Sequence, residues 1–225
     1  MSTKRTIVIA LFPGVTHLDF TGPHQFFCRV PDSEVIVASV EGKDIEADGL
    51  VFSGLESLSA VQKCDILCVP GGFGVLAAAQ TPSFMSEIIR LADSATYITS
   101  VCSGSIILAA AGLLNGKRGA CHWAWRSLLA EFPQVTVENN RVVRDGNTFT
   151  GGGVTAGIDM ALTVIAELAG DQMAQAIQLG LEYAPEPPFN SGRPELAPEH
   201  ITALVTANFA GAMEENKKIV AGLVA

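Results

Sequence analysis

One strand-to-helix junction constrains the fold of this chain more than any other stretch of its sequence. The β-rich run 96–101 leads directly into Cys102, and a helical stretch over 103–114 begins at once after it. That stretch is apolar on all sides, which is typical of a helix buried at the centre of a domain. A buried strand beside a buried helix needs covering layers on each side. The junction therefore predicts an α/β domain built around a central sheet.

Short β-rich runs and helical patterns alternate along most of the chain. Continuous runs of the kind found in parallel sheets that are buried on both faces cover residues 6–12, 34–39, 65–70 and 96–101. Helices are predicted over 18–29, with Pro23 near the opening turn, over 83–92 and over 155–169. Short strands are predicted over 135–137, 142–143 and 148–150, the last two joined as a hairpin by Asp145-Gly146-Asn147. This order predicts a doubly wound, mostly parallel sheet flanked by helices, of the flavodoxin-like class.

The chain is expected to form one domain that ends in an arm. Residues 1–182 carry the alternating pattern, whereas residues 183–198 are rich in Pro, Asn, Ser and Gly, as an ordered loop is. A last helix is predicted over 199–220. We therefore expect an α/β domain over 1–182, with 183–225 forming a C-terminal loop and helical arm of the same domain.

Composition argues against several kinds of partner. The chain holds 14 basic and 23 acidic side chains, a net charge of −9, whereas nucleic-acid binding requires clustered Lys and Arg. No apolar run reaches the roughly 18 residues of a membrane span. The run after Lys4 and Arg5 ends at Pro13 without a signal-peptide cleavage site. The five cysteines of the chain are scattered, which suits free thiols in a reducing compartment. We therefore expect a cytoplasmic protein, with neither nucleic acid nor membrane as partner.

Cys102 occupies the position of a nucleophile elbow, in which a sharp turn projects a side chain from the carboxyl edge of a sheet. The small residues Ser103, Gly104 and Ser105 allow the helix to approach the strand closely. The positive end of that helix is expected to lower the thiol pKa below its ordinary value of about 8.5. The alternative is a small core residue, which is the usual role of a single buried cysteine. The junction favours a reactive thiol.

Two further turns are expected at the same edge of the sheet. Gly71 and Gly72 follow the run 65–70, and their backbone N–H groups either form an oxyanion hole or simply make a tight turn. Asp19 follows the run 6–12 and either caps the helix that begins there or faces the crevice. Burial in the crevice would favour the neutral carboxyl and make it a proton donor. The spacing leaves both interpretations of Asp19 open.

His122 is a weaker candidate. It could act as a base toward Cys102 only if the two side chains meet in space, and a structural histidine is the commoner case. Cys64 and Cys68 lack the spacing of a zinc site, so no metal site is expected.

A series of motifs distinguishes this chain further: Leu18-Asp-Phe-Thr-Gly-Pro23, Val69-Pro-Gly-Gly72, Ser100-Val-Cys-Ser-Gly-Ser105, His122-Trp123, Gly151-Gly-Gly153, Thr155-Ala-Gly-Ile-Asp159 and Leu181-Glu-Tyr-Ala-Pro185. In this order they resemble the ThiJ/PfpI superfamily, of the class I glutamine amidotransferase-like fold, over essentially the whole chain. The stretch 181–189 narrows the resemblance to the isocyanide (isonitrile) hydratase branch of that superfamily.

The resemblance implies that Cys102 is the nucleophile and Asp19 the general acid and base. It implies hydration of an isocyanide to an N-substituted formamide through a thioimidate on Cys102, with backbone N–H groups near Gly72 and Ser103 positioning the sulfur and the developing charge. It implies no metal or organic cofactor, and it suggests a homodimer. Many peptide-cleaving and deglycase-like members have His after the cysteine; Ser103 stands there in this chain, which argues against a Cys-His pair.

Two other functions compete with isocyanide hydration. One is a different cysteine-dependent reaction on the same fold, such as glyoxalase-like or deglycase-like chemistry on small carbonyls. The other is a non-catalytic redox or ligand sensor, since related regulators carry a similar domain before a DNA-binding region. Residues 183–225 hold three basic and five acidic side chains, a balance too acidic to read DNA.

Overall fold

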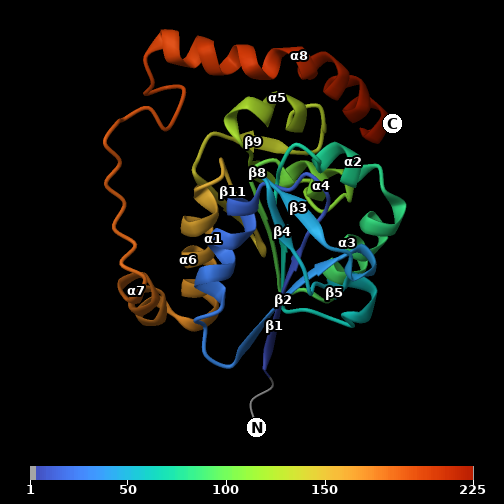
Figure 1. Ribbon diagram of the computed structural model, residues 1–225, viewed down its shortest axis with the longest axis vertical. Coiled ribbons are helices and arrows are strands. Elements are labelled where there is room, and N and C mark those ends of the chain that lie inside the picture. The colour runs from blue at the N-terminus through green and yellow to red at the C-terminus, as the bar shows by residue number, and fades with distance from the viewer. Residues whose placement is uncertain (1–3, 225) are drawn as a thin grey trace.

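A seven-stranded sheet forms the centre of the protein, in a computed structural model that describes residues 4–224 (Figure 1). The strand order is β10-β11-β7-β6-β1-β2-β5, and every neighbouring pair is parallel except β10 with β11. The strands are β1 (Arg5–Ala10), β2 (Ser33–Ser39), β5 (Glu56–Ser57), β6 (Ile66–Val69), β7 (Tyr97–Val101), β10 (Val142–Asp145) and β11 (Thr148–Gly151). The predicted mostly parallel α/β fold is confirmed.

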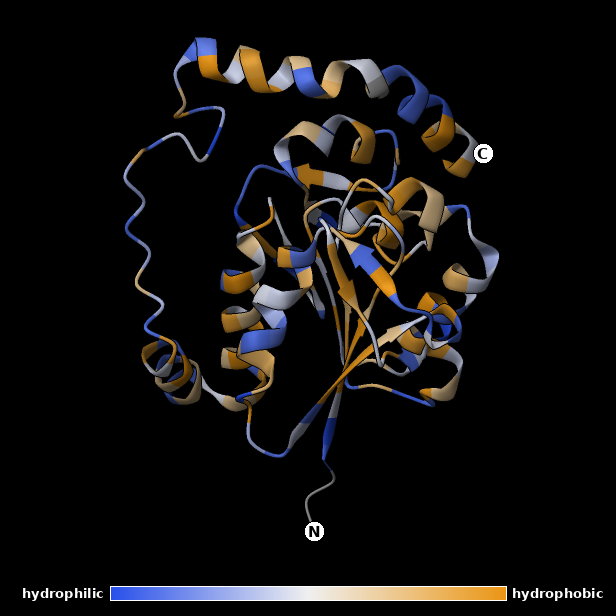
Figure 2. Cartoon of the chain, viewed as in Figure 1, coloured by the Kyte–Doolittle hydropathy of each residue, from blue (hydrophilic) through white to orange (hydrophobic). Residues whose placement is uncertain are grey.

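Helices cover both faces of this sheet. On one face α1 (His17–Phe27) packs against α6 (Ala156–Ala169), and on the other α2 (Val75–Ala79) packs against α3 (Pro82–Ser94) and α4 (Gly104–Ala110) (Figure 1). Two small pairs of strands lie outside the sheet, β3 (Ile45–Ala47) with β4 (Leu50–Phe52) and β8 (Arg118–Ala120) with β9 (Thr136–Glu138). Figure 2 shows the central strands as the most apolar part of the molecule. Ile7, Val8 and Ile9 of β1 are fully buried, as expected of a strand covered on both faces.

Two predictions differ from the structure, and some short elements were missed. The helix expected over 103–114 ends at Ala110, because Gly112 takes a left-handed φ of 73° and turns the chain back. Pro23 lies well inside α1 rather than in its opening turn. The strand expected over 135–137 is β9, and it pairs with β8, an element that the sequence pattern missed. The hairpin about Asp145-Gly146-Asn147 forms as predicted.

A C-terminal arm crosses the molecule. Helix α7 (Asp171–Gly180) lies at one end, an extended segment follows it, and α8 (Glu199–Val224) lies across the opposite end above α5 (Arg126–Leu129) (Figure 1). Contacts with α2 and α5 hold α8 there. Among residues 4–224, no helix has both the length and the apolar character that a membrane crossing requires.

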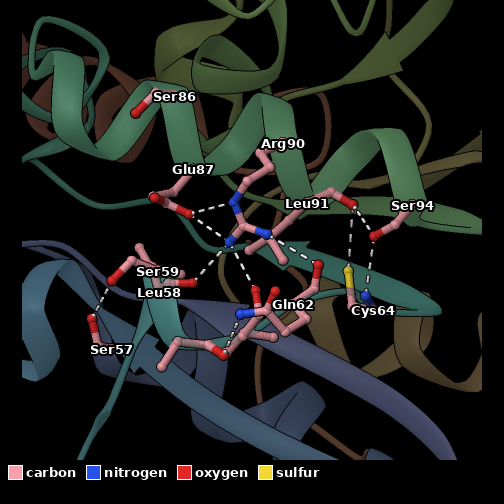
Figure 3. Close-up of polar contacts among 12 residues, drawn as sticks. Ser57, Leu58, Ser59, Gln62, Cys64, Ser86, Glu87, Arg90, Leu91 and Ser94 are labelled. Atoms are coloured by element: carbon pink, nitrogen blue, oxygen red, sulfur yellow. Dashed lines mark hydrogen bonds and ion pairs between the residues drawn. The ribbon is translucent and has the colours of Figure 1, made fainter.

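Arg90 on α3 ties this helix to the segment that precedes β6 (Figure 3). Its guanidinium donates hydrogen bonds to the carbonyl oxygens of Leu58 at 2.9 Å, Val61 at 2.8 Å and Gln62 at 3.1 Å. The Glu87 carboxylate accepts two more and neutralises the charge. One side chain therefore serves three backbone acceptors of the segment that connects to β6.

We expect Arg90→Ala to destabilise the protein by about 2 kcal/mol, because it removes several charge-assisted hydrogen bonds at once. For a chain of this size that corresponds to a fall in melting temperature of roughly 4–8 °C, measurable by differential scanning calorimetry. Arg29→Ala is the matched control, since exposed Arg29 donates to neighbouring Gln25 rather than to a separate segment. Equal melting temperatures for the two variants would contradict the assignment.

Candidate active site

Three turns meet at the carboxyl edge of the sheet. Strands β7, β6 and β1 are neighbours and parallel, so the segments that follow them emerge side by side. Those segments carry Cys102, the Gly71-Gly72 turn and, at the start of α1, Asp19. The predicted candidates are therefore brought together by strand order alone.

Cys102 lies at a sharp turn between β7 and α4. Its φ is 60°, in the left-handed region, and its side chain is 6% exposed. The Cys102 N–H donates to the Gly151 carbonyl at 3.1 Å, which anchors the strained residue to β11. A β-carbon at Gly104 would lie 2.3 Å from the Val69 carbonyl oxygen, so only glycine allows this approach of α4 to β6. Such strain costs about 1–3 kcal/mol and tends to occur at functional positions.

Asp19 points toward the Gly71 turn and Cys102 instead of capping its own helix. Its side chain is fully buried, and its Oδ2 accepts a hydrogen bond from the Gly71 N–H at 2.9 Å. Its Oδ1 has no hydrogen-bond partner within residues 4–224. Burial raises the pKa of the Asp19 carboxyl to about 7, with a small contribution from the charge of Asp48, against the opposing effects of the Gly71 N–H and the Cys102 side chain. The carboxyl can thus give or take a proton near neutral pH.

The Cys102 thiol behaves differently from the prediction. Burial raises the pKa of this thiol, and the neighbouring charges of Asp19 and Cys121 raise it further, whereas the Ser103 N–H beside the sulfur lowers it. The expected lowering by the helix end was wrong, because α4 is only seven residues long and the desolvation of the sulfur outweighs it. The resting site therefore holds a neutral thiol beside an Asp19 carboxyl that loses its proton first.

Ser103 and Gly72 bind each other. The Ser103 hydroxyl accepts a hydrogen bond from the Gly72 N–H at 3.0 Å and donates one to the Gly72 carbonyl at 3.1 Å. A β-carbon at Gly71 would lie 2.5 Å from the Ser103 nitrogen, so glycine is required there as well. The Gly72 N–H is consequently occupied by Ser103, and the Ser103 N–H is the backbone donor that reaches the Cys102 sulfur.

A cavity of about 270 Å³ opens beside Cys102 and Ser103. Sequence reasoning missed most of its wall, because these residues come from loops and from the arm: Thr16, Asp48, Phe73, Trp125, Val154 and Phe209. Phe209 reaches the cavity from α8 and stacks on Phe73 with ring centroids 6.2 Å apart. The arm thus supplies one aromatic wall of this largely apolar cavity.

His122 lines the same cavity but does not serve as a base. Its Nδ1 accepts a hydrogen bond from the Ala124 N–H at 3.2 Å, which leaves the ring proton on Nε2. Burial and the nearby Arg126 lower the pKa of His122, so the ring stays neutral. A neutral ring with its proton on Nε2 can donate a hydrogen bond from that atom.

Residues 5–167 match the DJ-1/PfpI family, which includes the ThiJ/PfpI proteins that the motifs resemble. The chain belongs to the DJ-1/PfpI family. As a family member it is 46% identical over 195 residues to an isonitrile hydratase of Pseudomonas putida, covering 85% of this chain and 84% of that protein. It is also 31% identical to the transcriptional regulator CdhR of Pseudomonas aeruginosa, over 62% of this chain and 41% of the regulator.

The solved structures include a close match to the fold of this DJ-1/PfpI protein. A ThiJ/PfpI family protein from Pseudomonas syringae superposes with a TM-score of 0.92 at 35% identity, covering 96% of this chain and 90% of the other. That coverage extends past the matched family region and into the C-terminal arm.

Proposed function

We propose that this protein hydrates isocyanides to N-substituted formamides, with Cys102 as nucleophile and Asp19 as general acid and base. The observation that carries the proposal is the buried Asp19 carboxyl beside the strained Cys102 thiol, in a chain closely related to an isonitrile hydratase. Cys102 borders a largely apolar cavity, which suits the apolar body of an isocyanide, and Asp19 is buried behind it.

The first step transfers one proton and forms one carbon–sulfur bond. The Asp19 carboxylate takes the thiol proton while the sulfur attacks the terminal isocyanide carbon. Asp19 then gives that proton to the same carbon, whose lone pair forms the new C–H bond. The product is a neutral thioimidate on Cys102. The Ser103 N–H stabilises the charge on the sulfur as it develops.

The second step consumes one water. Asp19, ionised again, takes a proton from water, and the resulting hydroxide adds to the thioimidate carbon. The carbon–sulfur bond breaks and the electron pair returns to sulfur. One water proton ends on the substrate nitrogen and the other on the Cys102 sulfur, so the formamide leaves and the thiol is restored. Ser103 and Gly72 act by position, since their mutual hydrogen bonds hold the turn that faces Asp19.

The proposal includes a homodimer and a cytoplasmic location. Leu50 and Val51 on the β3–β4 hairpin are 52% and 66% exposed, which supports contact with a second copy. All five cysteines are free thiols, as suits a reducing compartment. Light scattering during size-exclusion chromatography tests the dimer: a single species of monomer mass would contradict it.

Competing substrates test the reaction itself. Purified protein should convert cyclohexyl isocyanide to N-cyclohexylformamide, followed by gas chromatography, and should leave methylglyoxal unchanged. The expectation rests on Asp19 rather than His122 being the titratable partner of Cys102. Conversion of methylglyoxal to lactate, without production of formamide from the isocyanide, would instead support a glyoxalase-like reaction.

A further inference from the structure

A second cavity lies beside the one that holds Cys102. It has a volume of about 190 Å³ and shares His122 and Val154 with the first cavity. Its wall is much more polar, and it includes Arg126, Arg141 and Arg193. A ligand that extends past the shared wall would therefore pass from an apolar site to a cationic one.

The three arginines come from three separate segments. Arg126 begins α5, Arg141 precedes β10, and Arg193 belongs to the arm between α7 and α8. The whole chain has only 14 basic residues and a net charge of −9. Three arginines therefore gather at one cavity of a protein whose net charge is negative. The fold, and not closeness in the sequence, brings them together.

Carboxylates of the protein only partly neutralise this cluster. Arg141 forms an ion pair with Asp159, and Arg126 lies 3.4 Å from Glu195. Arg193 forms no ion pair within residues 4–224, and its Nη2 donates only to the Asn139 carbonyl, at 2.9 Å. Three positive charges thus face two negative ones, and one charge remains uncompensated.

One hydrogen-bond donor at the cavity also lacks a partner. The Nε of Arg126 is buried without an acceptor within the described part of the chain. Gly153, Val154 and Thr155 line the same cavity just before α6, where they are partly or fully exposed. A buried donor is normally satisfied, so the Nε of Arg126 points to an acceptor supplied by a ligand.

We propose that the second cavity binds a carboxylate carried by the substrate, so that the preferred isocyanides have an acidic group at the end remote from the isocyano carbon. This inference rests on the proposed function. A guanidinium presents paired N–H donors that match the two oxygens of a carboxylate. With the acid held there, the shared wall at His122 and Val154 directs the rest of the molecule toward Cys102.

A matched pair of substrates tests the inference. Para-isocyanobenzoate and para-isocyanobenzamide have the same shape and differ in charge. The kcat/KM of the benzoate should exceed that of the benzamide by at least about tenfold, the effect of a single charge-assisted hydrogen bond. Arg193→Gln and Arg126→Gln should each remove this preference through a higher KM for the benzoate, with a much smaller change for the benzamide. Arg144→Gln is the control, because Arg144 pairs with Glu167 away from the cavity.

A binding experiment separates failure of this inference from failure of the proposed reaction. The chain has two tryptophans, and Trp123 lines the second cavity while Trp125 lines the first. Titration with para-formamidobenzoate should therefore change the tryptophan fluorescence, and Arg193→Gln should weaken that binding. Hydration of both substrates with equal efficiency would overturn the carboxylate site and leave the reaction intact. Binding that depends on Arg193 without any hydration would support the site and overturn the reaction.

Discussion

Replacement of Cys102 by alanine should abolish formamide production, reducing kcat by at least about 10⁴-fold, because no other group near Asp19 can form the covalent intermediate. The thiol both lies beside the Asp19 carboxyl and lines the cavity, whereas the neighbouring Ser103 hydroxyl is engaged by Gly72. Gas chromatography of the formamide gives the rate. Cys102→Ser should also be nearly inactive, since an alcohol is far more difficult to deprotonate than a thiol and Asp19 is a weak base.

The control for this experiment is Cys64→Ala. Cys64 is also a buried thiol, 3% exposed, but it precedes β6 at the opposite edge of the sheet. Both substitutions remove one sulfur from the core and should have similar effects on the melting temperature. Full activity in the Cys102 variant, or equal loss in the two variants, would contradict covalent catalysis at Cys102.

Much of the fold was predictable because the sheet is parallel and buried. Strands covered on both faces must be short, continuous and β-rich, and β1, β2, β6 and β7 show this pattern in the sequence. The strands that were missed are short ones. β3, β4 and β8 lie outside the central sheet, and β5 is a two-residue strand at its edge, so their stability comes from tertiary contacts that leave little periodic signal.

The candidate site was predictable where it depended on strand order. Parallel strands bring their following turns to one edge of the sheet, so the strand pattern of the sequence is enough to place Cys102, Gly71 and Asp19 there. The direction of the thiol pKa was not predictable, because it depends on how completely the sulfur is buried. Phe209 was not predictable either, since it reaches the cavity only through the path of the arm.

The second large effect should follow from Asp19→Asn, which we expect to lower kcat by about 10²- to 10⁴-fold. Asparagine keeps the size of the side chain, and its Oδ1 can still accept the Gly71 N–H, but it cannot take the thiol proton. Asp65→Asn is the matched control, since Asp65 accepts the Thr6 N–H at the far edge of the sheet. Unchanged turnover in Asp19→Asn would contradict the role of the carboxyl in proton transfer.

The pH dependence of this variant provides an independent check on the same carboxyl. The first step needs ionised Asp19 beside a neutral thiol, so the wild-type kcat/KM should fall as pH drops below about 7, the pKa of Asp19. Asp19→Asn should lose that inflection.

The stability of the wild type should fall as pH rises, whereas its activity increases. The raised pKa of Asp19 means that folding favours the protonated carboxyl, and this contribution is lost as pH rises from the unfolded to the folded pKa. Between about pH 4 and about pH 8, Asp19→Asn should therefore gain up to about 4 kcal/mol in unfolding free energy relative to the wild type, measurable by urea denaturation. A constant difference across this range would show that Asp19 titrates normally in the folded protein.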